Sequence, residues 1–199
     1  MKLALRAIMF AAVIASAWFA LAAHAQFGRP LEITLDVPEE PGVIPDDNYE
    51  VNPDFVRKVV FYRTHEQPGT IVVDTSERML YLVMRDNLAM RYGIGVGRDG
   101  FRWKGQLKVT RKSEWPDWIP PAEMIDRQPY LPRFMAGGPG NPMGARALYL
   151  GGTVYRIHGT NQPHTIGEAV SSGCFRLVNH DVMDLYERVP VGTRVVVQP

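Results

Sequence analysis

One cysteine and one histidine in this sequence have the residue types and surroundings of a nucleophile and its base. Cys174 is the only cysteine and stands in SSGCFRLVN (171–179), and His158 stands sixteen residues earlier in RIHGTN. A thiol attacks as the thiolate, and its free pKa of about 8.5 means that it needs a neighbouring base or cation. We therefore predict that Cys174 is the nucleophile and that His158 is its base or imidazolium partner. Gly173 lets backbone amides approach an oxyanion, so the predicted chemistry is acyl transfer through a thioester.

Spacing alone leaves three other interpretations of these residues open. Cys174 could be a buried apolar residue, with His158 a hydrogen-bonded residue at the end of a strand. His158, His164 and Cys174 could bind a metal ion, although no CxxC or HExxH spacing supports a zinc site. Ser171 or Ser172 could be the nucleophile, but neither lies in a GxSxG turn. The pattern favours the cysteine and histidine without excluding these alternatives.

The amino-terminal residues have the order of a secretory signal peptide. MKLALR is followed by an apolar run over 7–21, and AHA at 23–25 is a small-x-small cleavage pattern. The run is shorter than the about 20 residues of a membrane span, so we expect cleavage after Ala25 rather than an uncleaved anchor. The mature protein should then be periplasmic, without a stable membrane span. A lone cysteine in such an oxidising compartment is either inert or kept for its reactivity.

Charge and composition divide the rest of the chain at about residue 55. Residues 26–55 carry eight acidic side chains against one arginine and are rich in proline, which predicts a linker or extended arm. Residues 56–199 carry 19 Lys and Arg against 13 Asp and Glu, and we expect one catalytic domain here. The surplus of six positive charges favours a polyanionic partner such as cell-wall polymer, although a solvated surface of mixed charge explains the same count. The sequence of residues 56–199 does not have the dense run of Lys and Arg that is typical of a nucleic-acid-binding protein.

Short β-rich runs separated by turn residues predict a mainly β domain, a sandwich or barrel with one or two short helices. DTSER (74–78) has the polar residues of a hairpin turn. NHDVMDLYERV (179–189) predicts a helix that Asn179 or Asp181 can cap, and AEMIDRQ (122–128) can form one or two helical turns. The predicted strands are 58–62, 70–74, 79–84, 89–95, 106–110, 147–150, 153–157 and 193–198.

The long irregular segment 112–144 is dense in proline, glycine and aromatic residues. A connection of this length in a compact domain is usually functional. Trp115, Trp118 and Tyr130 could form a wall on which a substrate stacks, or they could hold the loop against the core.

Several segments in order closely resemble the YkuD family of L,D-transpeptidases, the bacterial cell-wall enzymes also named after ErfK and YbiS. They are IVVDTSERMLYLV, YGIGVGR, GGPGNPMGARALYL, IHGTN, TIGEAV and SSGCFRLVN, and they cover most of 58–198. Ordered agreement over several motifs is far more specific than a single pattern.

The resemblance implies a β-sandwich with the cysteine in a cleft beneath a flap. It implies that Cys174 attacks the amide before the terminal D-alanine of a peptidoglycan stem peptide, and that an amine, usually of another diaminopimelate, resolves the acyl-enzyme. Gly159 would orient His158 through its carbonyl, and the amides of Gly173 and Cys174 would form the oxyanion hole. Arg176 would hold the site or a substrate carboxylate unless it forms a structural ion pair. The other substrate-binding positions implied are Ser171, Ser172 and Asn179.

The resemblance leaves the acceptor open. The products would be 3-3 cross-links or an outer-membrane protein attached to the wall, and the alternatives are hydrolysis of the same bonds or a wall-binding module without catalysis. Many relatives carry histidine where this chain has Ser172, a difference that bears on acceptor choice or rate. The resemblance implies no metal or organic cofactor, and it implies inhibition by carbapenems.

Overall fold

The structure, a computed structural model, describes residues 49–199. The predicted signal peptide and residues 26–48 of the predicted arm lie outside the described residues. At the end of that arm, Asn52 accepts a hydrogen bond from the Asp54 amide at 3.0 Å and begins the 3-10 turn η1 (Pro53–Phe55). The Phe55 side chain then packs where Gly93 and Gly167 leave room, since a Cβ atom at either glycine would overlap it. These last arm residues are therefore part of the packed domain.

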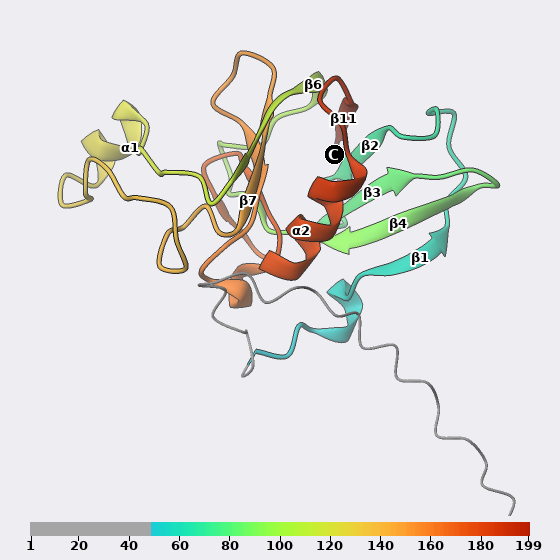
Figure 1. Ribbon diagram of the computed structural model, residues 1–199, viewed down its shortest axis with the longest axis horizontal. Coiled ribbons are helices and arrows are strands. Elements are labelled where there is room, and N and C mark those ends of the chain that lie inside the picture. Colours follow the sequence, from blue (N-terminus) through green and yellow to red (C-terminus); the bar gives the residue numbers. More distant parts are fainter. Residues whose placement is uncertain (1–48) are drawn as a thin grey trace, which may run out of the picture. The chain divides into compact units, whose positions relative to one another are not determined.

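The predicted mainly β sandwich with two short helices is confirmed (Figure 1). Within residues 49–199 the helices are α1 (Ala122–Arg127) and α2 (Asn179–Arg188), with a second 3-10 turn, η2 (Pro163–Thr165). Nine strands pair in the order β1 (Lys58–Phe61), β4 (Leu88–Gly93), β3 (Met79–Val83), β2 (Ile71–Asp74), β11 (Arg194–Gln198), β6 (Gly105–Glu114), β7 (Arg146–Leu150), β8 (Arg156–His158) and β10 (Phe175–Arg176). Two short strands, β5 (Val96–Gly97) and β9 (Ala169–Ser171), pair separately.

Strand β6 connects the two halves of the sandwich. Its first residues pair with β11 and its last residues pair with β7, and the register shifts between Val109 and Arg111. Such a bulge bends a strand and increases its twist, so one strand can serve both layers. Helix α2 packs beside β7, and its apolar side chains Val182 and Leu185 enter the core (Figure 1).

The hairpin predicted at 74–78 is present. The Asp74 carboxylate accepts hydrogen bonds from the amides of Ser76 and Glu77 at 3.0 and 2.8 Å, and Arg78 adopts a positive φ of 59°. The side chain of an aspartate can thus satisfy turn amides that no strand pairs. Strands β2 and β3 pair directly across this turn.

The predicted side-chain cap of α2 is wrong. The helix begins at Asn179 after Val178, and no side chain within residues 49–199 caps it. The Asn179 Oδ1 atom instead accepts hydrogen bonds from the amides of Ala145 and Thr160, at 3.0 and 3.3 Å. Asn179 therefore ties the beginning of β7 and the chain after His158 to the helix.

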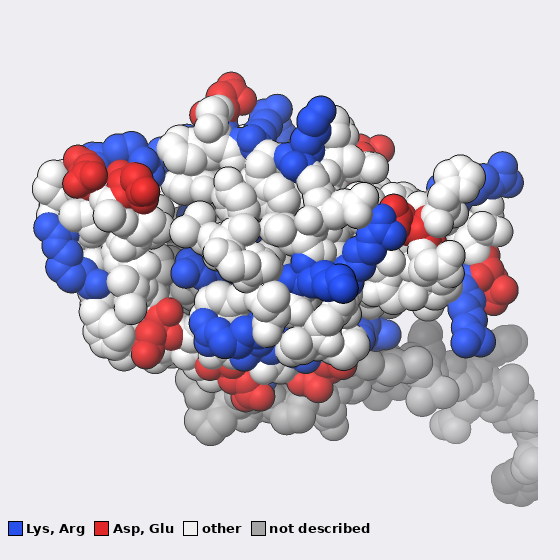
Figure 2. All heavy atoms as spheres, turned by 90° about the horizontal axis from the view of Figure 1, so that it is seen from above, with Lys and Arg blue, Asp and Glu red and all other residues white. Residues whose placement is uncertain are grey.

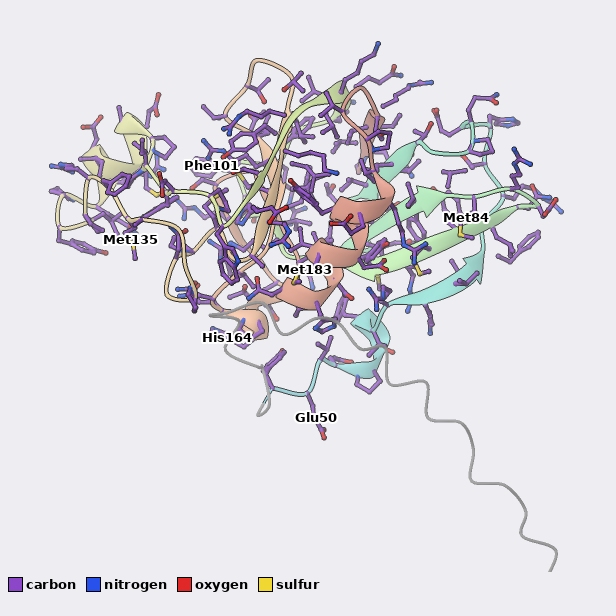
Figure 3. The ribbon with its side chains drawn as sticks, in the orientation of Figure 1. Glu50, Met84, Phe101, Met135, His164 and Met183 are labelled. Atoms are coloured by element: carbon purple, nitrogen blue, oxygen red, sulfur yellow. The ribbon has the colours of Figure 1, made fainter. Side chains whose placement is uncertain are left out.

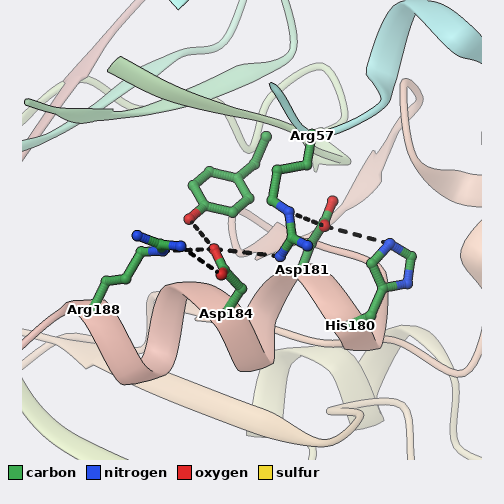
Figure 4. A network of polar contacts seen from close by, with 6 residues as sticks. Arg57, His180, Asp181, Asp184 and Arg188 are labelled. Carbon is green, nitrogen blue, oxygen red and sulfur yellow. Dashed lines mark hydrogen bonds and ion pairs between the residues drawn. The ribbon is translucent and has the colours of Figure 1, made fainter. Parts of the chain in front are cut away.

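A polar network on α2 joins the helix to the chain before β1 (Figure 4). Arg57 lies 3.5 Å from Asp181 and 3.3 Å from Asp184. Asp184 also accepts a hydrogen bond from the Tyr92 hydroxyl at 2.6 Å and pairs with Arg188 at 2.9 Å. Burial raises the pKa of the Asp181 carboxyl, against the charges of His180 and Arg57.

We expect Arg57→Met to lower the free energy of unfolding by about 3 kcal/mol at pH 7, since it leaves the buried Asp181 carboxylate without this cation. The loss should shrink toward pH 4, because the carboxyl with the raised pKa is then protonated and needs no partner. Urea unfolding at both pH values measures the difference. The exposed neighbour variant Lys58→Met is the control, and a loss that does not change with pH would contradict the explanation.

Candidate active site

The parallel pair of β8 and β10 brings the predicted nucleophile and base to one face. His158 is opposite Arg176 in the register, and Cys174 comes two residues before Arg176. Because side chains alternate along a strand, residues two apart share a face, so Cys174, Arg176, His158 and Arg156 point the same way. All four line one cavity of about 490 Å³. The predicted pair thus meets in one cleft.

His158 is buried, with 5% of its surface exposed. Its Nδ1 atom lies 2.6 Å from the carbonyl oxygen of Gly159, which is the contact expected of that glycine. Burial, followed by the charge of Arg176, lowers the pKa of His158 to about 3. The ring is therefore neutral at pH 7, and with the proton on Nδ1 the Nε2 atom is the basic nitrogen.

A tight turn holds Cys174. The buried Ser171 hydroxyl donates a hydrogen bond to the Cys174 carbonyl at 2.6 Å and accepts one from the Gly173 amide at 3.1 Å. Gly173 has a φ of 103°, and a Cβ atom there would lie 2.7 Å from the Tyr155 ring. Only glycine fits this position without strain.

These contacts change the roles expected of Ser171 and Gly173. The Ser171 hydroxyl is committed to the turn, which removes support for Ser171 as a nucleophile or a direct substrate ligand. The Gly173 amide is also occupied, so it is not a free oxyanion donor. The Cys174 amide has no acceptor among residues 49–199, and Ser172 lines the cleft beside it.

The thiol of Cys174 is half-buried, and its surroundings favour the protonated form. Burial raises its pKa, while the charge of Arg156, a hydrogen bond from the Arg156 backbone and the charge of Arg176 lower it. The Sγ atom donates a weak hydrogen bond to the Val154 carbonyl at 3.7 Å. From the sequence, a histidine partner for Cys174 predicts a depressed thiol pKa. That prediction is wrong, because the resting pair is a neutral thiol and a neutral imidazole.

We expect Arg156→Gln and Arg176→Gln each to shift the alkylation of Cys174 toward higher pH. Both cations stabilise the thiolate, so losing either raises the pKa of the thiol further, and alkylation at pH 7.5 should slow. Iodoacetamide rates between pH 6 and 10 give the profiles, with Arg85→Gln, an exposed arginine, as the charge control. A wild-type inflection below that of a free cysteine would contradict this electrostatic description.

Within residues 49–199, the cleft is lined by cations and by no carboxylate. Arg98, Arg127, Arg156 and Arg176 line it, and no aspartate or glutamate of this part of the chain does. The polar partner of the Arg176 guanidinium within residues 49–199 is the Gln162 Oε1 atom at 3.5 Å, so the structural ion pair considered for Arg176 is not formed there. Among the described residues, the Nε atoms of Arg156 and Arg176 are buried without a hydrogen-bond partner. Both arginines are only partly buried and line the cleft, so an anionic ligand there can pair with their charge. Elsewhere, basic and acidic side chains are interspersed on the face in Figure 2, without a basic stripe.

The long segment 112–144 forms one side of the cleft. Trp118 and Met135 exchange backbone hydrogen bonds at 2.8 and 2.9 Å, which fold the segment back on itself (Figure 3). Of the three aromatic residues predicted as a stacking wall, Trp118 lines the cavity, whereas Trp115 does not and Tyr130 is 80% exposed.

Several residues that line the cleft were not predicted from the sequence. Arg156 could have been found, because it lies two residues before His158 on the same strand and must share its face. Arg98 and Arg127 had no such signal. Asn179 and His164 do not line the cavity, and no three His, Cys, Asp or Glu side chains gather as metal ligands within 49–199.

Comparison with known proteins agrees with this geometry. Residues 68–197 match the model of the YkuD family, described as an L,D-transpeptidase catalytic domain. The chain belongs to this family. It is 43% identical over 132 residues to the probable L,D-transpeptidase ErfK/SrfK of Escherichia coli strain K12, an alignment that covers 63% of this chain and 42% of that protein. The chain thus matches about two fifths of the length of this curated relative.

Two solved structures extend the comparison. One, named as a probable carnitine operon oxidoreductase from Brucella melitensis, is 50% identical with a TM-score of 0.50, over 74% of this chain and 96% of that chain. An L,D-transpeptidase from Mycobacterium smegmatis is 17% identical with a TM-score of 0.53, over 65% and 58%, and shares the fold. Among the described residues of this YkuD member, no helix is long and apolar enough to cross a membrane.

Proposed function

We propose that this protein is a cysteine L,D-transpeptidase that acts on peptidoglycan stem peptides. The observation that carries the proposal is the presence of Cys174 and a neutral His158 on one strand-pair face of a cleft that arginines line and that no carboxylate of residues 49–199 lines. Such a cleft suits a substrate with free carboxylates, and the residue pair suits acyl transfer. Membership of the family supports the same reaction class.

The first half-reaction breaks the amide between the L-centre of the diamino acid and the terminal D-alanine. The Sγ atom of Cys174 bonds to the carbonyl carbon as its proton passes to Nε2 of His158. The imidazolium then gives this proton to the leaving nitrogen, so D-alanine departs and a thioester remains. Because both groups start neutral, the proton transfer must accompany the attack.

The second half-reaction restores the enzyme. An amine attacks the thioester, His158 takes a proton from it, and the thiolate of Cys174 leaves and is reprotonated. The new amide joins donor and acceptor. If water attacks instead, the product is the free acid of the donor.

The other residues have supporting roles in this proposal. The Cys174 amide donates to the oxyanion, and Gly159 holds the tautomer of His158 through the 2.6 Å contact at Nδ1. Arg156 and Arg176 stabilise the thiolate and hold a donor carboxylate. Asn179 fixes the backbone on both sides of the site, and Ser172 contacts substrate at the cleft wall.

A tetrapeptide donor ending in D-alanine tests the proposal. We expect intact mass to show one acyl group on the protein with release of one D-alanine, and an added diamino acid should convert this species into a cross-linked peptide. Product that ignores the added amine would indicate hydrolysis. Absence of an acyl-enzyme would leave a wall-binding module and overturn the proposal.

The cellular setting is part of the same proposal. Export through the signal peptide at 1–25 would bring the enzyme to the periplasm, where the stem peptides are, and an outer-membrane protein would be an alternative acceptor. Amino-terminal sequencing of the protein from the cell envelope should begin at Gln26. A chain that begins at Met1 would indicate an anchored form.

A further inference from the structure

Two of the four cleft arginines come from elements other than the strands that hold the reacting pair. Arg156 and Arg176 come from β8 and β10, the strands that hold the reacting pair. Arg98 follows β5, where its amide donates to the Ser171 carbonyl at 3.0 Å, and Arg127 ends α1. The charges of Arg156 and Arg176 lower the pKa of the Cys174 thiol, whereas Arg98 and Arg127 do not contribute to its shift. The cleft therefore has two groups of cations.

Arg98 and Arg127 both contact the aromatic ring of Phe101. Their guanidinium carbons lie 4.6 and 5.0 Å from the centroid of its ring. The Phe101 amide donates to the Arg98 carbonyl at 2.9 Å, so a tight turn fixes the ring beside the first arginine. Figure 3 shows Phe101 on the side of the sheet toward α1, which carries the second. A cation over an aromatic face is attracted to it, so the ring holds both side chains in place.

No counter-ion accompanies this arginine pair within residues 49–199. Asp99 is in the same turn, but it pairs with Arg102 at 3.2 Å and does not line the cavity. Glu123 and Asp126 of α1 are exposed and do not line it either. Two like charges held on one ring, beside a cleft that no carboxylate of the described chain lines, favour the binding of an anion.

We propose that Arg98 and Arg127, stacked on Phe101, bind the carboxylate of the incoming amine, so that the enzyme prefers acceptors that carry a carboxylate beside the reacting amine. This inference rests on the proposed function. The donor carbonyl must reach Sγ, beside Arg156 and Arg176, so these cations serve the donor. An acceptor reaches the same carbon with its amine, and the rest of it extends toward the remaining two cations.

Two acceptors that differ only in their carboxylates test the inference. The acyl-enzyme from the tetrapeptide donor is mixed with 2,6-diaminopimelate or with 1,5-diaminopentane, which has the same carbon spacing between amines and no carboxylate. The ratio of the two aminolysis rates should fall about tenfold in Arg98→Gln and in Arg127→Gln, the loss expected for one charge-assisted contact at a partly exposed site. The rate ratio of Arg127→Lys should lie between those of the wild type and Arg127→Gln, because lysine keeps the charge but lacks the planar guanidinium group. Arg85→Gln, outside the cleft, should keep the wild-type ratio.

Each outcome has a separate meaning. If the acyl-enzyme forms and both glutamine variants keep the wild-type ratio, the subsite is wrong and the proposed function stands. If the acyl-enzyme never forms in the wild type, the proposed function fails and the inference fails with it. A wild-type preference for a lysine-terminated peptide over 2,6-diaminopimelate would also overturn the inference. Calorimetric binding of 2,6-diaminopimelate to the Cys174→Ala protein, with and without Arg127→Gln, checks the subsite without turnover.

Discussion

Replacing Cys174 by serine should reduce D-alanine release by roughly 10⁴-fold or more, as expected for loss of a nucleophile from a cooperating set. A hydroxyl has a far higher pKa than a thiol, and the neutral His158 is too weak a base to ionise it. Intact mass after incubation with a carbapenem should show one adduct on the wild type and none on Cys174→Ser. The fold should persist, because the two side chains have nearly the same shape.

Ser172, the serine near Cys174, provides a control for this prediction. Ser172 lines the cleft, whereas the Ser171 hydroxyl is held in the turn, so Ser172 is the serine that could compete for the role. An adduct that persists in Cys174→Ala and disappears in Ser172→Ala would move the nucleophile to Ser172. An adduct lost in Cys174→Ala alone supports the thioester.

His158→Gln should slow acylation by roughly 10² to 10⁴-fold, the range for loss of a general base. In the resting protein both groups are neutral, so the thiol can attack only as Nε2 takes its proton. Glutamine keeps a polar side chain near the Gly159 carbonyl but has no basic nitrogen. Single-turnover mixing with the tetrapeptide donor measures this rate.

The pH profile of alkylation distinguishes a general base from a residue that only shifts the pKa of the Cys174 thiol. A neutral imidazole carries no charge that could lower the pKa of Cys174, so His158→Gln should change the pH profile of iodoacetamide alkylation much less than Arg156→Gln does. A large shift of the alkylation profile to higher pH in His158→Gln would show instead that the resting pair is thiolate and imidazolium.

Oxidation of the lone thiol is slowed by the same electrostatics. Because burial keeps Cys174 protonated, peroxide should inactivate the enzyme more slowly than it would a thiolate, and the loss should be reversed by reductant at first.

The strands and the main helix could be predicted from the sequence because their signals are local. Alternating and β-branched residues marked 70–74, 79–84 and 193–198, and the polar residues of DTSER placed the hairpin. The short strands β5, β9 and β10 were not predicted, since two or three residues carry no period. The cap of α2 failed for a different reason: Asn179 has the right residue type for a cap, but two distant amides use its side chain.

The sequence by itself determined which residues could react. It contains a single thiol beside a glycine and a histidine at the end of an apolar strand, and both features can be read without the fold. Tertiary structure decided the protonation states of Cys174 and His158 and which residues surround them. It buried His158 and half-buried Cys174, so that desolvation favours the neutral form of both. It also used the Gly173 amide within the turn and brought Arg98, Arg127 and Arg156 to one cleft. These properties depend on desolvation and on distances between residues far apart in the chain, which packing sets and local sequence does not.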